Sequence, residues 1–256
     1  MILKYLSVFL LIPLSCFAHA NMDKVSLDDY QKLERFFHYL MHNSLMGYSL
    51  CGEKPVSIET FPSLSRIPTK SAIEIFTKYP GYSIVWNGLD AWLRNCHLFP
   101  SNNFTFRYIP EYNTIAIINK RATKKIIKKN LDLFHKCSNP DQTANDFLKE
   151  VCNPLEREYL ILFNTKLLGI LLGYGRNNSI AFSSKSYFLK LEGFKLYDAN
   201  NDLSEFMNPG FFVINNGMNE VENNDVKRIL RKAKNNVQRS FKKGKYFETF
   251  VNLFTK

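Results

Sequence analysis

Cysteine, glycine and proline are scarce in this sequence: its 256 residues contain 5 Cys, 11 Gly and 10 Pro. So little cysteine excludes a small disulfide scaffold, and so little glycine and proline excludes a collagen-like repeat. A disordered chain is excluded because 45% of the residues are hydrophobic. The length fits one large domain or two small ones, with room for a sizeable core. The 22 Phe residues predict a thick core or an apolar contact surface.

Acidic residues are also few, with 23 Asp and Glu against 34 Lys and Arg. Long hydrophobic runs are missing beyond the N-terminus. The best candidate, 159–174, contains Lys166 and ends among Gly173 and Gly175. A bilayer span needs about 20 consecutive apolar residues. We therefore expect no transmembrane segment after residue 20.

The first twenty residues have the pattern of a secretory signal peptide. Lys4 is their one charged residue, 5–14 is apolar, and Ala18-His19-Ala20 is a small-x-small cleavage site. The sequence therefore predicts cleavage after Ala20 and an exported chain 21–256, periplasmic or secreted, with a net charge of +10 in place of +11. One alternative is a lipoprotein anchored at Cys16, which Pro13 disfavours. Another is a buried N-terminal helix, which the polar residues that follow disfavour.

Four cysteines remain in the chain after that cleavage: Cys51, Cys96, Cys137 and Cys152. In an oxidising compartment they allow two bridges in three connectivities. Cys137 and Cys152 are the candidates for a local disulfide, since they are close in sequence. The alternative is that all four are small, partly buried free thiols.

Hydrophobic periodicity and turn residues predict an α+β fold. We expect one domain over 21–256, with antiparallel hairpins flanked by amphipathic helices and a long C-terminal helix. Ser26 and Asp29 resemble a capping box before the first helix, which Gly47 ends. The expected helices are 27–45, 71–78 (stopped by Pro80-Gly81), 89–98, 121–136, 141–151, 154–172 and 223–254 (kinked at Gly244). The expected strands are 48–58, 82–86, 179–182, 188–197 and 211–214, with a hairpin of 104–108 and 114–118.

Basic residues are concentrated on two of these helices. They are Lys124, Lys125 and Lys128 in 121–136, and Arg228, Arg231, Lys232 and Arg239 in 223–254. A basic amphipathic helix can lie against an anionic membrane surface or bind an acidic protein partner. The alternative is that these side chains only solvate the outer faces of packed helices. We do not expect nucleic acid as a partner, because no base-reading motif is present and export removes the chain from the chromosome.

Two histidine motifs were weighed as chemical sites. His38 and His42 lie four residues apart on one helical face, which suits a pair of metal ligands. They lack the intervening glutamate of a zinc protease, and no third ligand can be named. The neighbours Cys96 and His97 do not predict thiol catalysis, since adjacent residues rarely point at each other. The sequence therefore predicts no metal and no cofactor.

A glycine-rich segment, Gly169 to Gly175, is the most distinctive local pattern. It matches neither the dinucleotide fingerprint nor a P-loop. Gly173 and Gly175 predict left-handed backbone that ends a helix and turns into a strand. The donors at 176–179 then either cap this turn, which we favour, or line a cleft.

Two stretches, HNSLMGYSLCGEKPVSIETF (42–61) and LGILLGYGRNNSIAF (168–182), together with KKGKYFETFVNLF (242–254), resemble an uncharacterised family of exported proteins from bacteria that live inside host cells. The resemblance implies export but no activity, fold or catalytic residue. The positions that it singles out are Gly47, Tyr48, Gly52, Lys54, Pro55, Gly169, Gly173, Tyr174, Gly175 and Arg176.

Two functions follow as hypotheses. The first is an exported, non-enzymatic binding protein that contacts an anionic surface or partner. The alternative is an enzyme, such as a hydrolase, acting on an envelope or host substrate. Its cleft would lie between the loops 47–55 and 173–179, with Glu53, Lys54, Arg176 and Asn177 as ligand-binding residues. No catalytic residue can be named from the sequence.

Overall fold

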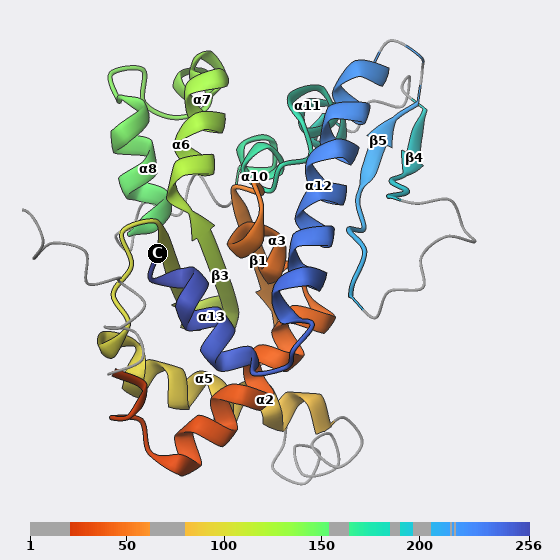
Figure 1. Cartoon of the computed structure of the whole chain (residues 1–256). Helices are drawn as coiled ribbons and strands as arrows, with labels where there is room; N and C mark the ends of the chain where they lie inside the picture. Colours follow the sequence, from red (N-terminus) through yellow and green to blue (C-terminus); the bar gives the residue numbers. More distant parts are fainter. Residues whose placement is uncertain are drawn as a thin grey trace, which may run out of the picture.

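The computed structural model describes residues 21–61, 80–153, 164–184, 190–196, 206–215, 217 and 219–256. The predicted signal peptide and the predicted helix 71–78 lie outside these ranges. The elements, drawn in Figure 1, are α2 (Leu27–Asn43), α3 (Met46–Cys51), β1 (Val56–Thr60), α5 (Pro80–Asn95), η2 (Cys96–Leu98), β2 (Phe104–Ile109), η3 (Pro110–Tyr112), β3 (Thr114–Asn119), α6 (Lys120–Lys129), α7 (Leu131–Cys137), α8 (Ala144–Cys152), α10 (Thr165–Leu171), α11 (Arg176–Ser183), β4 (Leu191–Gly193), β5 (Phe212–Ile214), α12 (Glu220–Phe241) and α13 (Tyr246–Phe254).

A three-stranded antiparallel sheet has the order β1-β3-β2. Its β2–β3 hairpin confirms the prediction, with the chain turning through η3 and Asn113, whose φ is 45°. The central strand β3 is buried along almost its whole length. Ile115 and Ile117 belong to one apolar cluster, whereas Ile118 belongs to another. The sheet therefore lies between two cores, because alternate side chains of a strand point to opposite faces.

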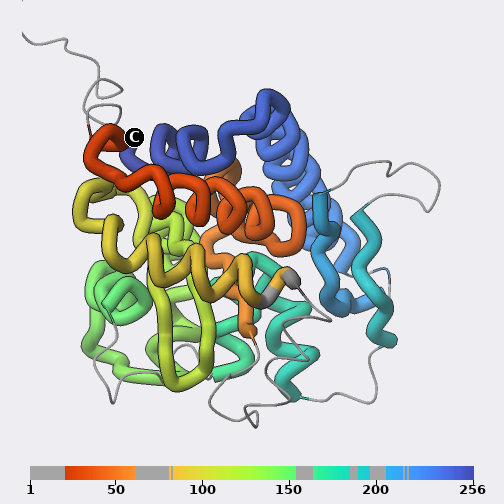
Figure 2. Tube along the Cα trace, turned by 90° about the horizontal axis from the view of Figure 1, so that it is seen from below, coloured from red at the N-terminus to blue at the C-terminus, as the bar shows by residue number. Residues whose placement is uncertain are grey.

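The larger core is rich in aromatic rings. Helix α2 packs between α5 and α13, as Figures 1 and 2 show. Phe37 on α2 stacks on Phe250 of α13 at 3.8 Å and meets Trp92 of α5 edge-on at 5.3 Å between ring centroids. The abundant phenylalanine is thus used for a thick core, as predicted. On the other face of the sheet, α6, α8 and α10 enclose the smaller cluster, where Phe134 and Phe147 meet at 5.3 Å.

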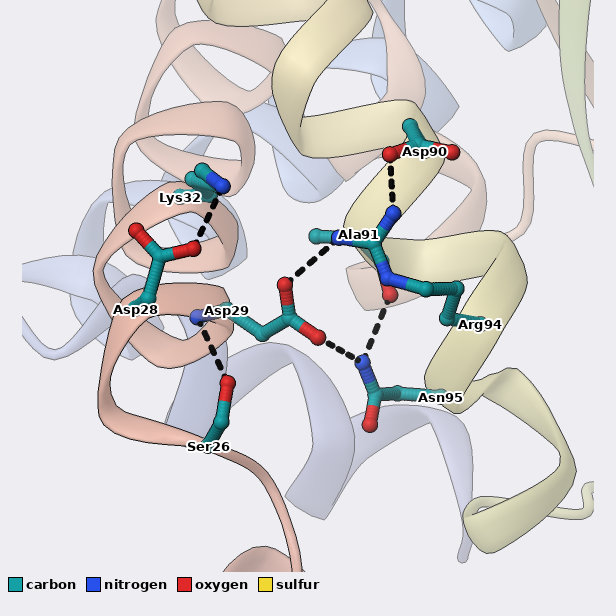
Figure 3. A network of polar contacts seen from close by, with 8 residues as sticks. All are labelled: Ser26, Asp28, Asp29, Lys32, Asp90, Ala91, Arg94 and Asn95. Atoms are coloured by element: carbon teal, nitrogen blue, oxygen red, sulfur yellow. Dashed lines mark hydrogen bonds and ion pairs between the residues drawn. The ribbon is translucent and has the colours of Figure 1, made fainter.

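A polar clamp joins α2 to α5 (Figure 3). The Asp29 N–H donates to Ser26 Oγ at 3.1 Å, so the predicted N-cap is confirmed. The Asp29 carboxylate accepts from Arg94 at 2.6 Å and from Asn95 at 2.8 Å. In a full capping box the Asp29 carboxylate would accept from the Ser26 N–H. Here it contacts α5 instead. Arg94 holds the pKa of Asp29 below its usual value.

The α+β class is confirmed, with small antiparallel sheets and a long helix near the C-terminus.

Several expected strands are wrong. Residues 46–51 form α3, so Gly47 lies inside a helix, and only 56–58 of the expected strand 48–58 belongs to a strand, β1. Residues 82–86 belong to α5, which includes Pro80 and Gly81 and continues through most of the expected helix 89–98. Residues 179–182 belong to α11. Of 188–197, β4 occupies Leu191–Gly193, and 211–214 is confirmed as β5.

Three expected helices are shorter or divided. The basic helix 121–136 is split at Asn130 into α6 and α7. Asn164 is the N-cap of α10, with extended backbone, so 154–172 is not one continuous helix. Gly244 and Lys245 both have positive φ and separate α12 from α13, which is a break in place of the expected kink. Helix 141–151 is confirmed as α8, with a full capping box at Thr143.

Within the described part of the chain, no helix combines the length and the apolar character that a bilayer crossing requires.

Candidate functional site

The loops 47–55 and 173–179 do meet, as the enzyme hypothesis requires, and Lys54 joins them. Its side chain is fully buried, and Nζ donates to the Val56 carbonyl at 2.5 Å and to the Leu172 carbonyl at 2.8 Å. The Tyr174 ring lies 5.8 Å from Nζ. Burial lowers the pKa of Lys54 to about 7. Lys54 is therefore a buried link between two loops, and it is not presented to a ligand.

Arg176 and Asn177 belong to the first turn of α11. The Glu222 carboxylate accepts from the backbone N–H of Arg176 and Asn177 at 3.0 Å each and of Asn178 at 3.2 Å. The Arg176 guanidinium makes a bidentate pair with Asp132 at 2.8 and 2.6 Å. These contacts favour the capping interpretation of 176–179 over the cleft. Gly173 and Gly175 have the expected positive φ, but the chain continues into a helix and not a strand.

Asn178, one of the donors predicted at 176–179, is buried and holds this region together. Asn178 Oδ1 accepts from the Ile214 N–H at 2.9 Å and from Asn219 at 3.0 Å. Its Nδ2 donates to the Tyr174 carbonyl at 2.9 Å and to Asn223 at 3.0 Å. A fully satisfied buried amide fixes α11 against β5 and α12. The sequence did not predict its partners, since they lie up to 45 residues away.

A cleft of about 260 Å³ lies between α3, the start of α6 and α12. Packing of α12 against α3 forms one wall, and Figure 1 shows α6 and α12 on either side of α3 and β1. Leu50, Phe104 and Ala233 supply apolar lining. Glu53, Arg228 and Lys232 supply charged lining, together with Asn119 and Asn236. Glu53 is the one predicted ligand-binding residue that lines this cleft.

The two asparagines of the cleft hold its walls. Asn119 donates to the Ser49 and Gly52 carbonyls at 3.1 Å each. Asn236 on α12 donates to the Cys51 carbonyl at 2.8 Å. Gly52 sits so close to α12 that an added Cβ would lie 2.5 Å from the Cβ of Ala233. The amides and the close approach therefore fix the shape of the cleft.

Cations from two helices surround Glu53. Lys125 Nζ of α6 lies 3.2 Å from Glu53 Oε2. This hydrogen bond is the main cause that lowers the pKa of Glu53, and the positive charges of Lys232 and Arg121 add to it. Residues 72 positions apart in the sequence thus share one electrostatic environment. The sequence predicted Lys125 and Lys232 on separate basic helices, the first of which begins at Arg121, but it did not predict that the two helices meet at Glu53.

The remaining residues of the predicted basic surface lie elsewhere on their helices. Lys128 is exposed, and Lys124 is half-buried. Arg231 donates to the Leu196 carbonyl at 2.9 Å, and Arg239 donates to Asn236 at 2.5 Å. The structure therefore concentrates Lys125, Arg228 and Lys232 at the cleft and gives Arg231 and Arg239 local contacts on α12.

In the part of the chain that the structure describes, the candidate histidines and cysteines form neither a metal site nor a disulfide. No group of three or more His, Cys, Asp or Glu is placed to hold a metal ion there. His42 Nε2 lies 2.8 Å from Tyr246 Oη and its ring stacks on Phe206, so it takes part in packing between α2 and α13. Cys137 and Cys152 are free thiols, as are the other two, so the predicted local bridge is not formed. Burial raises the pKa of Cys51 to about 12.

Comparison with known proteins identifies no relative: no family model, curated protein or solved structure matches the chain. The resemblance to exported proteins of intracellular bacteria therefore stays a prediction.

Proposed function

We propose that the protein is an exported binding protein without catalytic activity that engages an anionic surface or partner through its basic face. We define the basic face as the cleft residues Arg228 and Lys232 of α12 with the neighbouring Arg121 and Lys125 of α6. The observation that supports the proposal is the convergence of these two helices around Glu53.

The charge of the chain favours a membrane surface over a small acidic partner. The sequence carries a net charge of +11. A Lys or Arg near an anionic leaflet contributes about 1 kcal/mol, so four such residues give about 4 kcal/mol. This corresponds to weak and reversible binding, with a dissociation constant on the order of 1 mM per site. Such binding depends on salt, because at 0.1 M ionic strength counterions largely screen the attraction between exposed charges that are more than about 10 Å apart.

Export is part of the proposal and is supported by the pattern of residues 1–20. When the full chain is expressed in a bacterium, we expect it in the periplasm or the medium with Asn21 as its first residue. N-terminal sequencing of the recovered chain measures this directly. A chain that still begins at Met1, or that begins at a lipid-modified Cys16, would contradict cleavage after Ala20.

The chain recovered in this way tests the binding function by co-sedimentation with vesicles. We expect sedimentation with vesicles that contain phosphatidylglycerol, little with phosphatidylcholine alone, and progressive release as sodium chloride is added. Equal binding to both lipids, or binding that is indifferent to salt, would rule out an electrostatic membrane surface. Absence of binding at low salt would also count against the membrane and leave an acidic protein partner to be sought.

The enzyme alternative, with substrate held between the loops 47–55 and 173–179, gains no specific support. The loops meet, but Lys54 is enclosed, Glu53 faces Lys125, and Arg176 faces Asp132. We therefore keep the binding function as the conclusion.

A further inference from the structure

The cleft between α3 and α12 carries an excess of positive charge. Arg121 and Lys125 contribute from α6, and Arg228 and Lys232 contribute from α12. The carboxylates that accompany them are Glu53, 3.2 Å from Lys125, and Asp225, 3.2 Å from Arg228. These four cations are accompanied by two carboxylates, and Lys256 adds a further positive charge beside the cleft residue Cys51, so positive side chains are in excess at this point of the described structure.

These cations are available to an external ligand. Among the described residues, Arg121 and Lys232 form no hydrogen bond or ion pair. Lys125 and Arg228 each form one exposed ion pair, with side chains 77% and 70% exposed. Exposed pairs of this kind are weak and exchange readily with other anions. A ligand can thus take all four without breaking a buried contact.

The N-terminal end of α6 adds to the positive electrostatic potential of the cleft. Asn119 lines the cleft and is the N-cap of α6, which has ten residues. The N-terminal end of a helix carries partial positive charge and favours anions within its first turn. Leu50, Phe104 and Ala233 give the cleft apolar walls between these cations.

We propose that this cleft binds a phosphate monoester group, and that Glu53 is the internal counter-ion that this group displaces. A phosphate monoester carries up to two negative charges near neutral pH, so an excess of cations attracts it more strongly than a singly charged anion. Its oxygens suit the forked donors of Arg121 and Arg228. A phosphodiester or a single carboxylate carries one negative charge and leaves the cleft partly uncompensated. The inference rests on the proposed function, since it names the group that the basic face selects.

The test uses the recovered chain and two sources of the same group. Phosphatidic acid vesicles present a monoester headgroup, and phosphatidylglycerol vesicles of equal surface charge present a diester. Inorganic phosphate and glycerol 3-phosphate, titrated calorimetrically, present the soluble form. We expect phosphatidic acid vesicles to bind at least roughly fivefold more tightly than phosphatidylglycerol vesicles, and the soluble phosphates to compete.

Three variants assign the effect to the cleft. We expect the double variant Arg228→Ala with Lys232→Ala to lose about tenfold in affinity for phosphatidic acid. Glu53→Gln removes the competing carboxylate and is expected to bind several-fold more tightly. Arg35→Ala, on α2 and outside the cleft, is the matched control and is expected to bind as the wild type does. Circular dichroism of each variant verifies that it is folded.

The outcomes separate this inference from the proposed function. Equal affinity for the two anionic lipids, with no binding of inorganic phosphate, would overturn the phosphate monoester site and leave the binding function intact. Phosphate binding that depends on Arg228 and Lys232 without any lipid preference would support the site and assign it to a soluble phosphate ester. Wild-type affinity in the double variant would overturn the inference whichever ligand binds. Absence of binding to every anion would overturn the phosphate monoester site and the membrane surface together, and would leave the proposed function with an acidic protein partner alone.

Discussion

Single residues carry most of the chemistry that holds this molecule together, and several of them are polar and buried. Lys54, Asn178 and Glu222 each bond to backbone groups of segments far away in the sequence. A buried polar group costs free energy unless it is hydrogen-bonded, so the buried positions Lys54 and Asn178 tolerate few substitutions. The residues that the sequence marked as ligand-binding, Lys54 and Arg176, thus hold the structure in place.

Lys54 makes the stability of the protein depend on pH. Its pKa is about 7 when folded and 10.5 when exposed. Between these values the unfolded chain retains a proton that the native chain has released, so the free energy of unfolding rises with pH, by at most about 1.4 kcal/mol per unit. A neutral amine still has two hydrogens for the Val56 and Leu172 carbonyls. Below about pH 7, where Lys54 is protonated in both the folded and the unfolded chain, this rise in the free energy of unfolding is absent.

We therefore expect the difference in unfolding free energy between wild type and Lys54→Met to grow in favour of the wild type from pH 7 to about pH 8.5. Urea unfolding of both proteins at several pH values measures it. Comparison with the variant removes the contributions of other titrating groups. A difference that does not change with pH would show that the folded protein keeps Lys54 charged.

Elements are positioned by carboxylates from neighbouring helices. Glu222 of α12 caps α11, and Glu34 of α2 accepts from the N–H groups of Tyr246 and Phe247 at the start of α13, at 2.7 and 2.8 Å. Each carboxylate satisfies N–H groups that the capped helix cannot pair internally. The same charge also interacts favourably with the positive end of that helix. Caps of this kind couple helices that the chain order separates.

For Glu222→Ala we expect a loss of about 1–2 kcal/mol in unfolding free energy, because three N–H groups of α11 lose their acceptor. Glu222→Gln is expected to lose less, since its amide oxygen still accepts. Glu220→Ala, an exposed position in the same turn of α12, is the control. Chemical denaturation gives the values, and equal losses for Glu222→Ala and Glu220→Ala would refute the cap.

Close contact between α3 and α12 depends on Gly52. An added Cβ would lie 2.5 Å from the Cβ of Ala233 and 2.8 Å from the Tyr48 carbonyl oxygen, so backbone would have to move. We expect Gly52→Ala to destabilise the fold by about 1–3 kcal/mol.

Gly210→Ala is the matched control, because nothing lies within 4 Å of its added Cβ. Thermal and urea unfolding of both variants provide the comparison. A stability of Gly52→Ala equal to that of Gly210→Ala would mean that α12 does not approach α3 this closely.

Sequence patterns were sufficient where local interactions decide the structure. Ser26 caps α2 by accepting from the N–H of Asp29, three residues on, and the β2–β3 hairpin forms from two runs rich in aromatic and β-branched residues around a turn. Sequence patterns failed where contacts with residues distant in the sequence determine the local structure. The predicted strand at 179–182 is a helix that receives its cap from Glu222, and α3 is almost wholly buried, so it shows no amphipathic period.

The candidate site, like the fold, could be predicted from the sequence only in part. Glu53 and the basic helices were visible in the sequence as separate features. Their convergence depends on the packing of α12 against α3 and on the path from β3 into α6, which no local pattern encodes. The free state of Cys137 and Cys152 likewise follows from the fold and not from their spacing.

At the scale of the whole molecule, two cores on either side of one sheet form the body that carries the basic face. The α12–α3 contact and the start of α6 place cations of both helices at one cleft. We therefore expect the position of the cations, as well as the net charge of the chain, to determine binding. A crevice of about 150 Å³ between α2 and α5, lined by Lys32 and Arg35, provides a basic site elsewhere for comparison.

The most direct test is the affinity of the recovered chain for phosphatidylglycerol vesicles after reversal of one charge on α6, on α12 or in the crevice between α2 and α5. Lys125→Glu on α6 and Lys232→Glu on α12 are each expected to weaken binding roughly tenfold to thirtyfold and to reduce its salt dependence. Arg35→Glu makes the same change in net charge and is expected to stay within about twofold of the wild type. Equal losses in all three variants, or no loss in any, would contradict a binding face formed by α6 and α12.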